Sequence, residues 1–399
     1  MRYDLDRIRS SFPALDEGAA HFDGPGGSQV PRQVAEAVGR TLASAVANRG
    51  HLTSAERRAE RIVGEARQAV ADLLGAEHDG VVFGRSMTAL TFDFARTLSR
   101  QWRPGDEVVV TRLDHDANIR PWVLAAQAAG ATVRWADFDR DTGALPTASV
   151  TRLLGGRTRL VAVTGASNLL GTRPDVAAIA AAAHEVGALV HVDGVHLTPH
   201  APVDVAALGA DLFSCSPYKF LGPHLGVMAA APDLLEHLRP DKLLPSSDAV
   251  PERFELGTLP YELLAGTTAA IDFLADIAGG SGTRRTRLLE AMALLEAHEA
   301  ALAVRLEDGL DRLDGVRRLG LAPRRTPTVA FVVAGRRPQD VARHLADAGV
   351  NAPASHFYAI EAARYLGLGD DGAVRAGIAP YTDDADIDRL LAAVAETVG

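Results

Sequence analysis

The sequence predicts an α/β protein in which helices cover both faces of a parallel β-sheet. Between about residues 60 and 230, short apolar runs rich in β-branched residues alternate with Ala- and Leu-rich stretches of helical periodicity. Strands and helices that alternate in this way are typical of a wound parallel sheet. After residue 260 the pattern changes to one long helical stretch and then a short mixed segment. This change indicates a second, smaller α+β domain.

Five apolar runs are expected to form buried parallel strands, because continuous apolar runs of this length suit a sheet that is covered on both faces. They are GVVFG (80–84), EVVVT (107–111), ATVRWA (131–136), RLVAVTG (159–165) and ALVHVDG (188–194). Three stretches between or before them are expected to be helices. They are ARQAVADLLGA (66–76), VLAAQAAGA (123–131) and VAAIAAAAHEVGA (176–188).

The C-terminal third predicts a long helix over about 282–313, followed by the smaller domain. Its strands are expected at 328–335 and 373–379, and its helices at 338–349 and 383–399.

The expected domain organisation has three parts. The large domain covers residues 18–260, and 261–281 form a connecting helix. Residues 1–17 and 282–399 together form the small domain.

Composition excludes several classes of function. A net charge of −10 argues against nucleic-acid binding, which needs clustered cations. The single cysteine excludes an internal disulfide and a multi-cysteine metal site, and it fits a reducing cytoplasm. The first residues lack the apolar core of a signal peptide, and no apolar run reaches about 18 residues. We therefore expect a cytoplasmic protein with no membrane, metal or nucleic-acid partner.

Polar residues gather where the predicted strands end, which is where open α/β sheets bind ligands. They are Asp114, His115 and Asp116, then Ser167 and Asn168, then Asp193 and His196. Turn and helix-cap chemistry also explains each group. After Gly84 a helix starts near Ser86, and the unpaired amides of its first turn suit a phosphate.

Lys219 is the sharpest candidate, because it stands in apolar, Gly- and Pro-punctuated surroundings (SPYKFLGPHLGV) in a chain with few lysines. Desolvation lowers the pKa of an amine and makes it a nucleophile that can form a Schiff base. The alternative is a surface lysine whose aliphatic part lies along the protein. Together, Lys219, Asp193 and the helix start near Ser86 supply the amine, the carboxylate and the phosphate donors that pyridoxal phosphate needs.

Ordered motifs from HFDGPGGSQVP (21–31) to AVRAGIAPYTDDADIDRL (373–390) resemble the class V aminotransferase/cysteine desulfurase family of fold-type I, pyridoxal-phosphate-dependent enzymes. The most specific part is HVDGVH (191–196) with PVDVAALGADLFSCSPYKFLGPHLGV (202–227). The resemblance implies a large domain with a mostly parallel seven-stranded sheet, a smaller α+β domain, and a homodimer with shared active sites.

The resemblance also implies a role for individual residues. Lys219 would bind the cofactor covalently, Asp193 would pair with the pyridine nitrogen, and His115 would stack on the ring and shuttle protons. Asn168 and His196 would approach the ring oxygen.

The other implied contacts are with the phosphate and the substrate. The phosphate would be held by Thr88 and the backbone at Met87, by Ser216 and Tyr218, and by Thr258 of the neighbouring subunit. Arg375 would bind the α-carboxylate of the substrate.

The chain departs from the desulfurase pattern at three places. The segment NAPASHFYAIEAARYLG (351–367), where a catalytic cysteine is expected, contains none. Cys215 ends a presumed buried strand, so we interpret it as a core residue rather than a persulfide carrier. His196 stands where desulfurases have glutamine, and Tyr218 where many have histidine.

Two further stretches are candidates for substrate contact. Asn48, Arg49 and His51 are predicted at the mouth of the partner's site, although a polar loop that caps the next helix through Ser54 explains them too. In the second stretch, His356 and Tyr358 are predicted, with Phe357 between them, to shape the substrate pocket. A packed loop of the small domain is the alternative.

The expected reaction is β-elimination with cleavage of a carbon–sulfur bond in a cysteine-type substrate. Transamination and epimerisation of a small amino acid remain alternatives, and a persulfide-forming desulfurase lacks its thiol. A nicotinamide dehydrogenase is suggested by DGPGGS (23–28), but this stretch lacks the G-x-G-x-x-G spacing. A non-catalytic scaffold is disfavoured because Asp193, Lys219 and Arg375 occur together.

Overall fold

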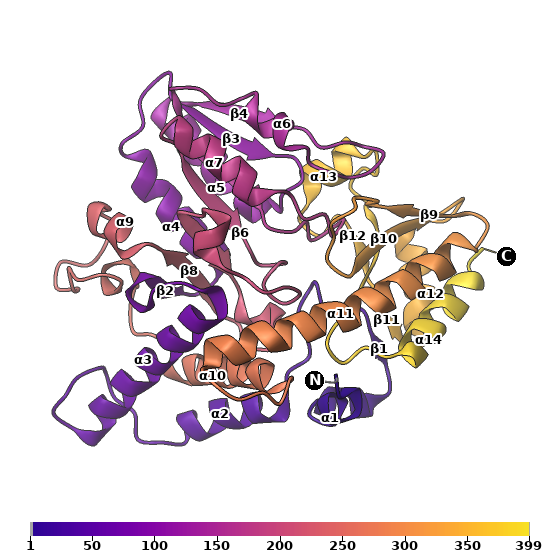
Figure 1. Ribbon diagram of the computed structural model, residues 1–399, viewed down its shortest axis with the longest axis horizontal. Helices are drawn as coiled ribbons and strands as arrows, with labels where there is room; N and C mark the ends of the chain where they lie inside the picture. The colour runs from indigo at the N-terminus through magenta and orange to yellow at the C-terminus, as the bar shows by residue number, and fades with distance from the viewer. Residues whose placement is uncertain (1–2, 399) are drawn as a thin grey trace.

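A seven-stranded sheet organises the larger part of the computed structural model, which describes residues 3–398 (Figure 1). Its strand order is β2-β8-β7-β6-β5-β3-β4. The strands are β2 (Val81–Gly84), β3 (Glu107–Thr111), β4 (Thr132–Ala136), β5 (Thr158–Thr164), β6 (Leu189–Asp193), β7 (Leu212–Cys215) and β8 (Gly226–Ala230). All neighbouring pairs from β4 to β7 are parallel, whereas β8 is antiparallel to both β7 and β2. The predicted mostly parallel seven-stranded sheet is therefore confirmed.

Helices cover both faces of this sheet, because successive residues of a strand point to opposite sides. Val109 of β3 packs in one apolar cluster with α3, α7, α10 and α11. Its neighbours Val108 and Val110 pack in a second cluster with α4, α5 and α9. The helices of this part are α2 (Arg32–Leu42), α3 (Ser54–Leu74), α4 (Met87–Ser99), α5 (Arg120–Ala129), α6 (Thr147–Thr151), α7 (Val176–Glu185), α8 (Val205–Leu208), α9 (Pro232–His237) and α10 (Tyr261–Asp276).

Three local expectations are wrong. Strand β2 is not paired in parallel, because its one neighbour in the sheet is β8, which is antiparallel to it. Strand β4 is an edge strand with half-exposed side chains rather than a buried strand. Its Arg134 bonds Glu107 at 3.1 Å, and its Trp135 ring packs under the Arg112 guanidinium at 4.9 Å. The cap of α3 is Thr53 rather than the next residue, and Glu56 completes a capping box with it.

The smaller part contains a four-stranded antiparallel sheet in the order β12-β13-β10-β9. These strands are β9 (Val316–Leu319), β10 (Thr328–Val333), β12 (Ala354–Ser355) and β13 (Ala373–Gly377). Its helices are α12 (Pro338–Asp347), α13 (Ile360–Tyr365) and α14 (Asp384–Ala395). The predicted strands and helices of the C-terminal third are all present, each shorter than predicted by a few residues.

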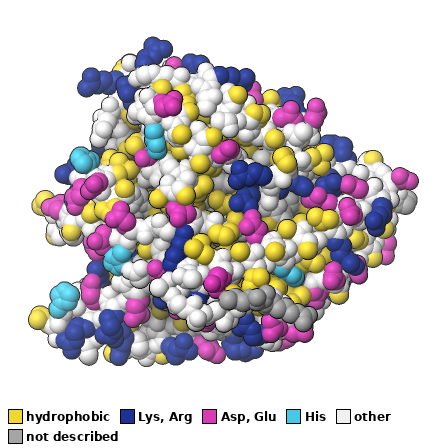
Figure 2. Space-filling view, viewed as in Figure 1, with side chains coloured by type: hydrophobic (Ala, Val, Ile, Leu, Met, Phe, Trp, Pro, Cys, Tyr) yellow, Lys and Arg dark blue, Asp and Glu magenta, His cyan; other side chains and the backbone are white. Residues whose placement is uncertain are grey.

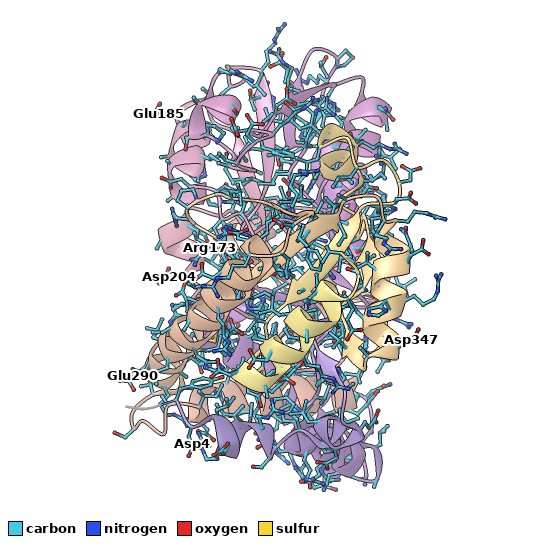
Figure 3. The ribbon with its side chains drawn as sticks, turned by 90° about the vertical axis from the view of Figure 1, so that its right-hand side faces the viewer. Asp4, Arg173, Glu185, Asp204, Glu290 and Asp347 are labelled. Carbon is cyan, nitrogen blue, oxygen red and sulfur yellow. The ribbon has the colours of Figure 1, made fainter. Side chains whose placement is uncertain are left out.

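Helix α11 (Arg284–Asp311) crosses the molecule from the large sheet to the smaller part, as the orange ribbon of Figure 1 shows. In Figure 3 the labelled Arg173 lies against this helix, and its Nη1 is 2.5 Å from Oε1 of Glu296. The helix therefore packs against both parts of the chain.

The remaining short elements connect these units. They are α1 (Leu5–Arg9), β1 (Ala20–His21), β11 (Val350–Asn351) and five 3-10 turns: η1 (Pro13–Glu17), η2 (His78–Gly80), η3 (Asp116–Asn118), η4 (Pro217–Lys219) and η5 (Glu252–Phe254).

The division into domains stays a proposal, and we shift the start of the proposed large domain. Strand β1 pairs in parallel with β11 of the smaller part, and Ala20 and Phe22 pack in its apolar cluster. We therefore propose that the large domain begins after Phe22 rather than at residue 18. Residues 1, 2 and 399 of the predicted small domain lie outside the described residues.

Acidic and basic side chains are interspersed over the face of the molecule in Figure 2. Within residues 3–398, no helix combines the length and apolar character needed to cross a membrane. The same residues contain no cluster of three metal-ligating side chains.

Candidate active site

A cavity of about 650 Å³ lies where β5, β6 and β7 end and face the smaller part of the chain. Ten of the residues predicted for the site line it. They are Met87, Thr88, His115, Asn168, Asp193, His196, Tyr218, Lys219, Tyr358 and Arg375. Their convergence from both parts of the chain makes this cavity the candidate active site.

Lys219 ends the short turn η4 that follows β7, where Pro217 occupies the first turn position. Its Nζ donates a hydrogen bond to the carbonyl of Pro25 and lies 5.0 Å from the centre of the Tyr218 ring. Burial, reinforced by the charge of Arg375, lowers the pKa of Lys219 to about 7. A large share of this amine is therefore neutral near pH 7 and available as a nucleophile or base.

Asp193 is the last residue of β6, and its Oδ1 accepts a hydrogen bond from the amide of Val195 at 3.0 Å. Among the described residues, this is the one hydrogen bond that its carboxylate accepts. Burial raises the pKa of Asp193 to about 6, a rise that the charge of Lys219 opposes. The carboxylate is thus largely ionised at neutral pH, with one oxygen left for a cationic ligand in the cavity.

His115 follows β3, and its Nδ1 accepts a hydrogen bond from the amide of Ala117 at 3.0 Å. Burial, with the charges of Lys219 and Arg375, lowers the pKa of His115 to about 4. The ring is therefore neutral, and because Nδ1 is the acceptor, we assign the proton to Nε2. In this tautomer His115 is a donor, so the base in the cavity is Lys219.

Arg375 and Asn168 join the two parts of the chain at the cavity. Nη1 of Arg375 donates to the carbonyl of Asn168 at 2.9 Å, and the guanidinium lies 3.7 Å from the centre of the Phe357 ring. Nδ2 of Asn168 donates to the carbonyl of Phe357 at 2.8 Å. Two buried atoms, Nε of Arg375 and Oδ1 of Asn168, have no partner among the described residues. Since such atoms are costly to leave unpaired, they indicate ligand positions.

Two threonines of the smaller part of the chain hold the His196 ring by hydrogen bonds. Its Nε2 lies 2.9 Å from Oγ1 of Thr328 and 3.1 Å from Oγ1 of Thr326. Burial lowers the pKa of His196 well below its usual value, so the ring is neutral. Neutral His196 therefore offers the cavity a hydrogen-bonding group without charge.

The opposite end of the cavity is formed by the start of α4. Ser86 caps this helix by accepting from the amide of Ala89 at 3.1 Å, whereas the amides of Met87 and Thr88 belong to the unpaired first turn. Gly226 of β8 allows the close approach, because a Cβ there would lie 2.4 Å from the Met87 amide nitrogen. The first turn of α4 therefore packs closely against β8 of the sheet.

Pyridoxal phosphate fits this set of groups. Lys219 supplies the amine, ionised Asp193 the partner for a pyridine nitrogen, and the first turn of α4 the phosphate donors. Asn168 lines the same cavity, and its unpaired Oδ1 would need a donor.

Six residues predicted for the site do not line the cavity of this chain. They are Asn48, Arg49, His51, Ser216, Thr258 and His356. Ser216 is buried beneath the site, and Nδ1 of His356 accepts from the amide of Tyr358 at 3.0 Å.

The other four lie on or beside exposed loops, where a role in a partner's site stays a prediction. Arg49 is already bound by two acids, with Nη2 at 2.7 Å from Glu60 and Nη1 at 3.0 Å from Glu252.

Cys215 lies on β7 with no exposed surface and packs in the main apolar cluster. Burial raises the pKa of its thiol far above the usual range, so little thiolate forms. These properties support its interpretation as a core residue.

Some cavity residues were missed by the sequence reasoning. Phe92 follows Thr88 by four residues on α4, so the two share a helix face. Arg120 begins α5 and forms an ion pair with Asp116 of η3. Pro25 and Gly26 also line the cavity, so the stretch DGPGGS contributes backbone to this site.

Comparisons with known proteins agree with this fold. The family model Aminotransferase class-V matches residues 20–390. An uncharacterized protein of Mycobacterium tuberculosis is 35% identical and covers 99% of each chain. The aminotransferase-like protein FGM3 of Gibberella zeae is 32% identical and covers 98% of each. Among solved structures, the cysteine desulfurase CsdA of Escherichia coli superposes with a TM-score of 0.88 at 28% identity, covering 100% of this chain and 99% of CsdA.

Proposed function

Because the chain belongs to the aminotransferase class-V family, whose cofactor is pyridoxal phosphate, we propose that it cleaves the carbon–sulfur bond of a cysteine-type amino acid by β-elimination. The net reaction consumes a cysteine that bears a substituent on sulfur and one water molecule. It releases a thiol, pyruvate and ammonium, so atoms and charge balance.

The absence of a usable thiol carries this proposal. A persulfide-forming desulfurase must place sulfur on a cysteine, and the chain has only Cys215. That residue is fully buried on β7, and the segment 351–367 beside the cavity contains no cysteine. Without a sulfur acceptor, the sulfur leaves with its substituent as a free thiol.

The charged groups of the cavity fit an amino-acid substrate. Nη1 of Arg375 is engaged by Asn168, so the Nε and Nη2 side of its guanidinium remains for the α-carboxylate. That side donates two parallel hydrogen bonds, which fix the orientation of a carboxylate. Burial lowers the pKa of Arg375 to about 9, so the group is still cationic at neutral pH.

The proton transfers fall to Lys219. Pyridoxal phosphate, when bound, withdraws electrons from the α-carbon of the substrate and so weakens its C–H bond. Lys219 would be released when the substrate amine takes its place on the cofactor. Its neutral amine would then accept the α-proton at Nζ, and the ammonium so formed would hold this proton for the departing sulfur. His115 is neutral and protonated at Nε2, so it donates a hydrogen bond and does not compete as a base.

Product analysis tests the reaction. We expect the purified holoenzyme to release pyruvate, ammonium and a thiol in equal amounts from S-substituted L-cysteines, with no keto acid added. Epimerisation would return the D-amino acid without pyruvate. A strict requirement for a keto acid, with amino transfer to it, would replace elimination by the aminotransferase alternative.

We also propose a cytoplasmic homodimer with shared active sites. Leu52 and Leu256 are apolar and exposed on the loops that Arg49 and Glu252 join, and the exposed Thr258 lies beside Leu256. Exposed apolar side chains on adjoining loops support a partner contact there. The lone, buried Cys215 fits a reducing compartment. Analytical ultracentrifugation should give a dimer at micromolar concentration, and a monomer would refute shared sites.

A further inference from the structure

The segment Ser355–Tyr358 carries an uncommon backbone beside the cavity. Phe357 and Tyr358 are consecutive and both left-handed, with φ angles of 50° and 59°. Side chains other than glycine rarely adopt this conformation, and when they do the surrounding structure must impose it. Two consecutive left-handed residues beside a cavity therefore suggest that the function of the site requires this backbone.

Hydrogen bonds from the large sheet's loops hold this segment. The carbonyl of Tyr358 accepts from the amide of Asp116 at 2.8 Å, and the carbonyl of Phe357 accepts from Nδ2 of Asn168 at 2.8 Å. Within the segment, the amide of Phe357 donates to Oγ of Ser355 at 3.2 Å. The segment is thus fixed by residues that follow β3 and β5 of the large sheet.

The conformation presents one aromatic ring to the guanidinium and the next to the cavity. Both rings line the cavity, where Phe357 packs under Arg375 and the Tyr358 side chain is 69% exposed. The Tyr358 ring also stacks on His115, with ring centres 5.4 Å apart and planes at 27°. The left-handed backbone therefore leaves the Tyr358 ring exposed at the cavity instead of burying it.

The cation on this wall of the cavity is paired with acids. Arg120 lines the cavity, but its Nη2 lies 3.0 Å from Asp116 and 3.7 Å from Glu361. Phe92 of α4 lines the same cavity. A substrate side chain here meets aromatic surface, and the cation beside it is already paired with acids.

We propose that Tyr358 and Phe92 select substrates whose side chain carries an uncharged aromatic or extended apolar group, such as S-benzyl-L-cysteine. A carboxylate bound by Arg375 lies against Phe357, and adjacent residues are about 3.8 Å apart between Cα atoms. The side chain of the same substrate is then within reach of Tyr358. This inference rests on the proposed function in one respect, the binding of the α-carboxylate by Arg375.

Binding to the holoenzyme tests the inference without requiring cleavage. The absorbance of the bound cofactor is titrated with L-phenylalanine, L-alanine and L-glutamate, which differ only in their side chains. Because burying a large apolar side chain strengthens binding about ten-fold or more, we expect phenylalanine to bind at least that much more tightly than the other two. Tyr358→Ala should lose this preference and leave the affinity for alanine within about two-fold.

Two variants serve as controls. Tyr358→Phe keeps the ring and should keep the preference, and Leu124→Ala removes an exposed apolar side chain of α5 outside the cavity and should change nothing. Equal binding of the three amino acids by the wild type, or an unchanged preference in Tyr358→Ala, would overturn the inference. A wild type that prefers phenylalanine but releases no pyruvate from S-benzyl-L-cysteine would refute the elimination and leave the selectivity standing.

Discussion

Lys219→Ala should lose both covalent cofactor binding and turnover. The chain has two lysines, and only Lys219 lines the cavity, where its amine has a pKa lowered to about 7. Removing this base should slow the reaction by about 1,000-fold or more. The wild type should absorb at roughly 410–430 nm, as expected for a cofactor bound through a lysine, and the variant should lack this band. Borohydride reduction followed by peptide mass analysis should find the cofactor on the Lys219 peptide alone.

Lys242→Ala is the matched control, because it removes the other lysine. Lys242 lies outside the cavity, and its Nζ is 3.1 Å from Asp248 on an exposed loop. This variant should keep the absorbance band, the label and the activity. Cofactor fixed on Lys242, or a normal band in Lys219→Ala, would refute the assignment of Lys219. Thermal unfolding of both variants checks that the alanine proteins fold.

The central sheet was predictable from the sequence because its strands are continuous apolar runs. Val108, Val109 and Val110 of β3 all have buried partners, since one face of the strand meets α4 and α5 and the other meets α3 and α7. The same pattern does not encode strand order. The run 131–136 looks like any other strand, yet β4 lies at the edge with its side chains half exposed.

The core of the site was predictable for a related reason. His115 and Asn168 follow strands and Asp193 ends one, and parallel strands bring their carboxyl ends to one edge of the sheet. Lys219 was recognised by its apolar surroundings, and the structure gives it the lowered pKa that such surroundings produce.

The walls of the cavity were less predictable, because they depend on packing between distant elements. Phe92 reaches the cavity only through the orientation of α4. The exposure of Tyr358 depends on a left-handed backbone imposed by Asp116 and Asn168, more than 180 residues earlier. Phe92 is marked only by its spacing of four residues from Thr88. Tyr358 was predicted because it stands in the segment where the desulfurase cysteine is expected, but nothing in that segment predicts its exposed ring.

Arg375→Gln should change the site in two measurable ways. The variant loses the two parallel N–H donors on the Nε and Nη2 side of the guanidinium. Binding of the α-carboxylate of any amino acid should therefore weaken by about 100-fold. The charge of Arg375 also helps to lower the pKa of Lys219, so the variant should raise that pKa above its value of about 7. Capture of pyridoxal phosphate by the apoprotein needs the neutral amine. Its rate should therefore rise with pH through about 7 in the wild type and through a higher pH in the variant.

Arg375→Lys separates charge from geometry. Lysine keeps a positive charge in the cavity but cannot donate two parallel hydrogen bonds to a carboxylate. This variant should keep the pH midpoint of cofactor capture close to the wild-type value, yet still bind amino acids weakly. Amino-acid affinity is measured from cofactor absorbance, and the capture rate from the same band at pH values from 6 to 10, on variants whose folding is verified by circular dichroism. Wild-type amino-acid affinity in both variants would mean that the carboxylate is bound elsewhere. An unchanged midpoint in Arg375→Gln would mean that burial alone, and not the neighbouring cation, lowers the pKa of Lys219.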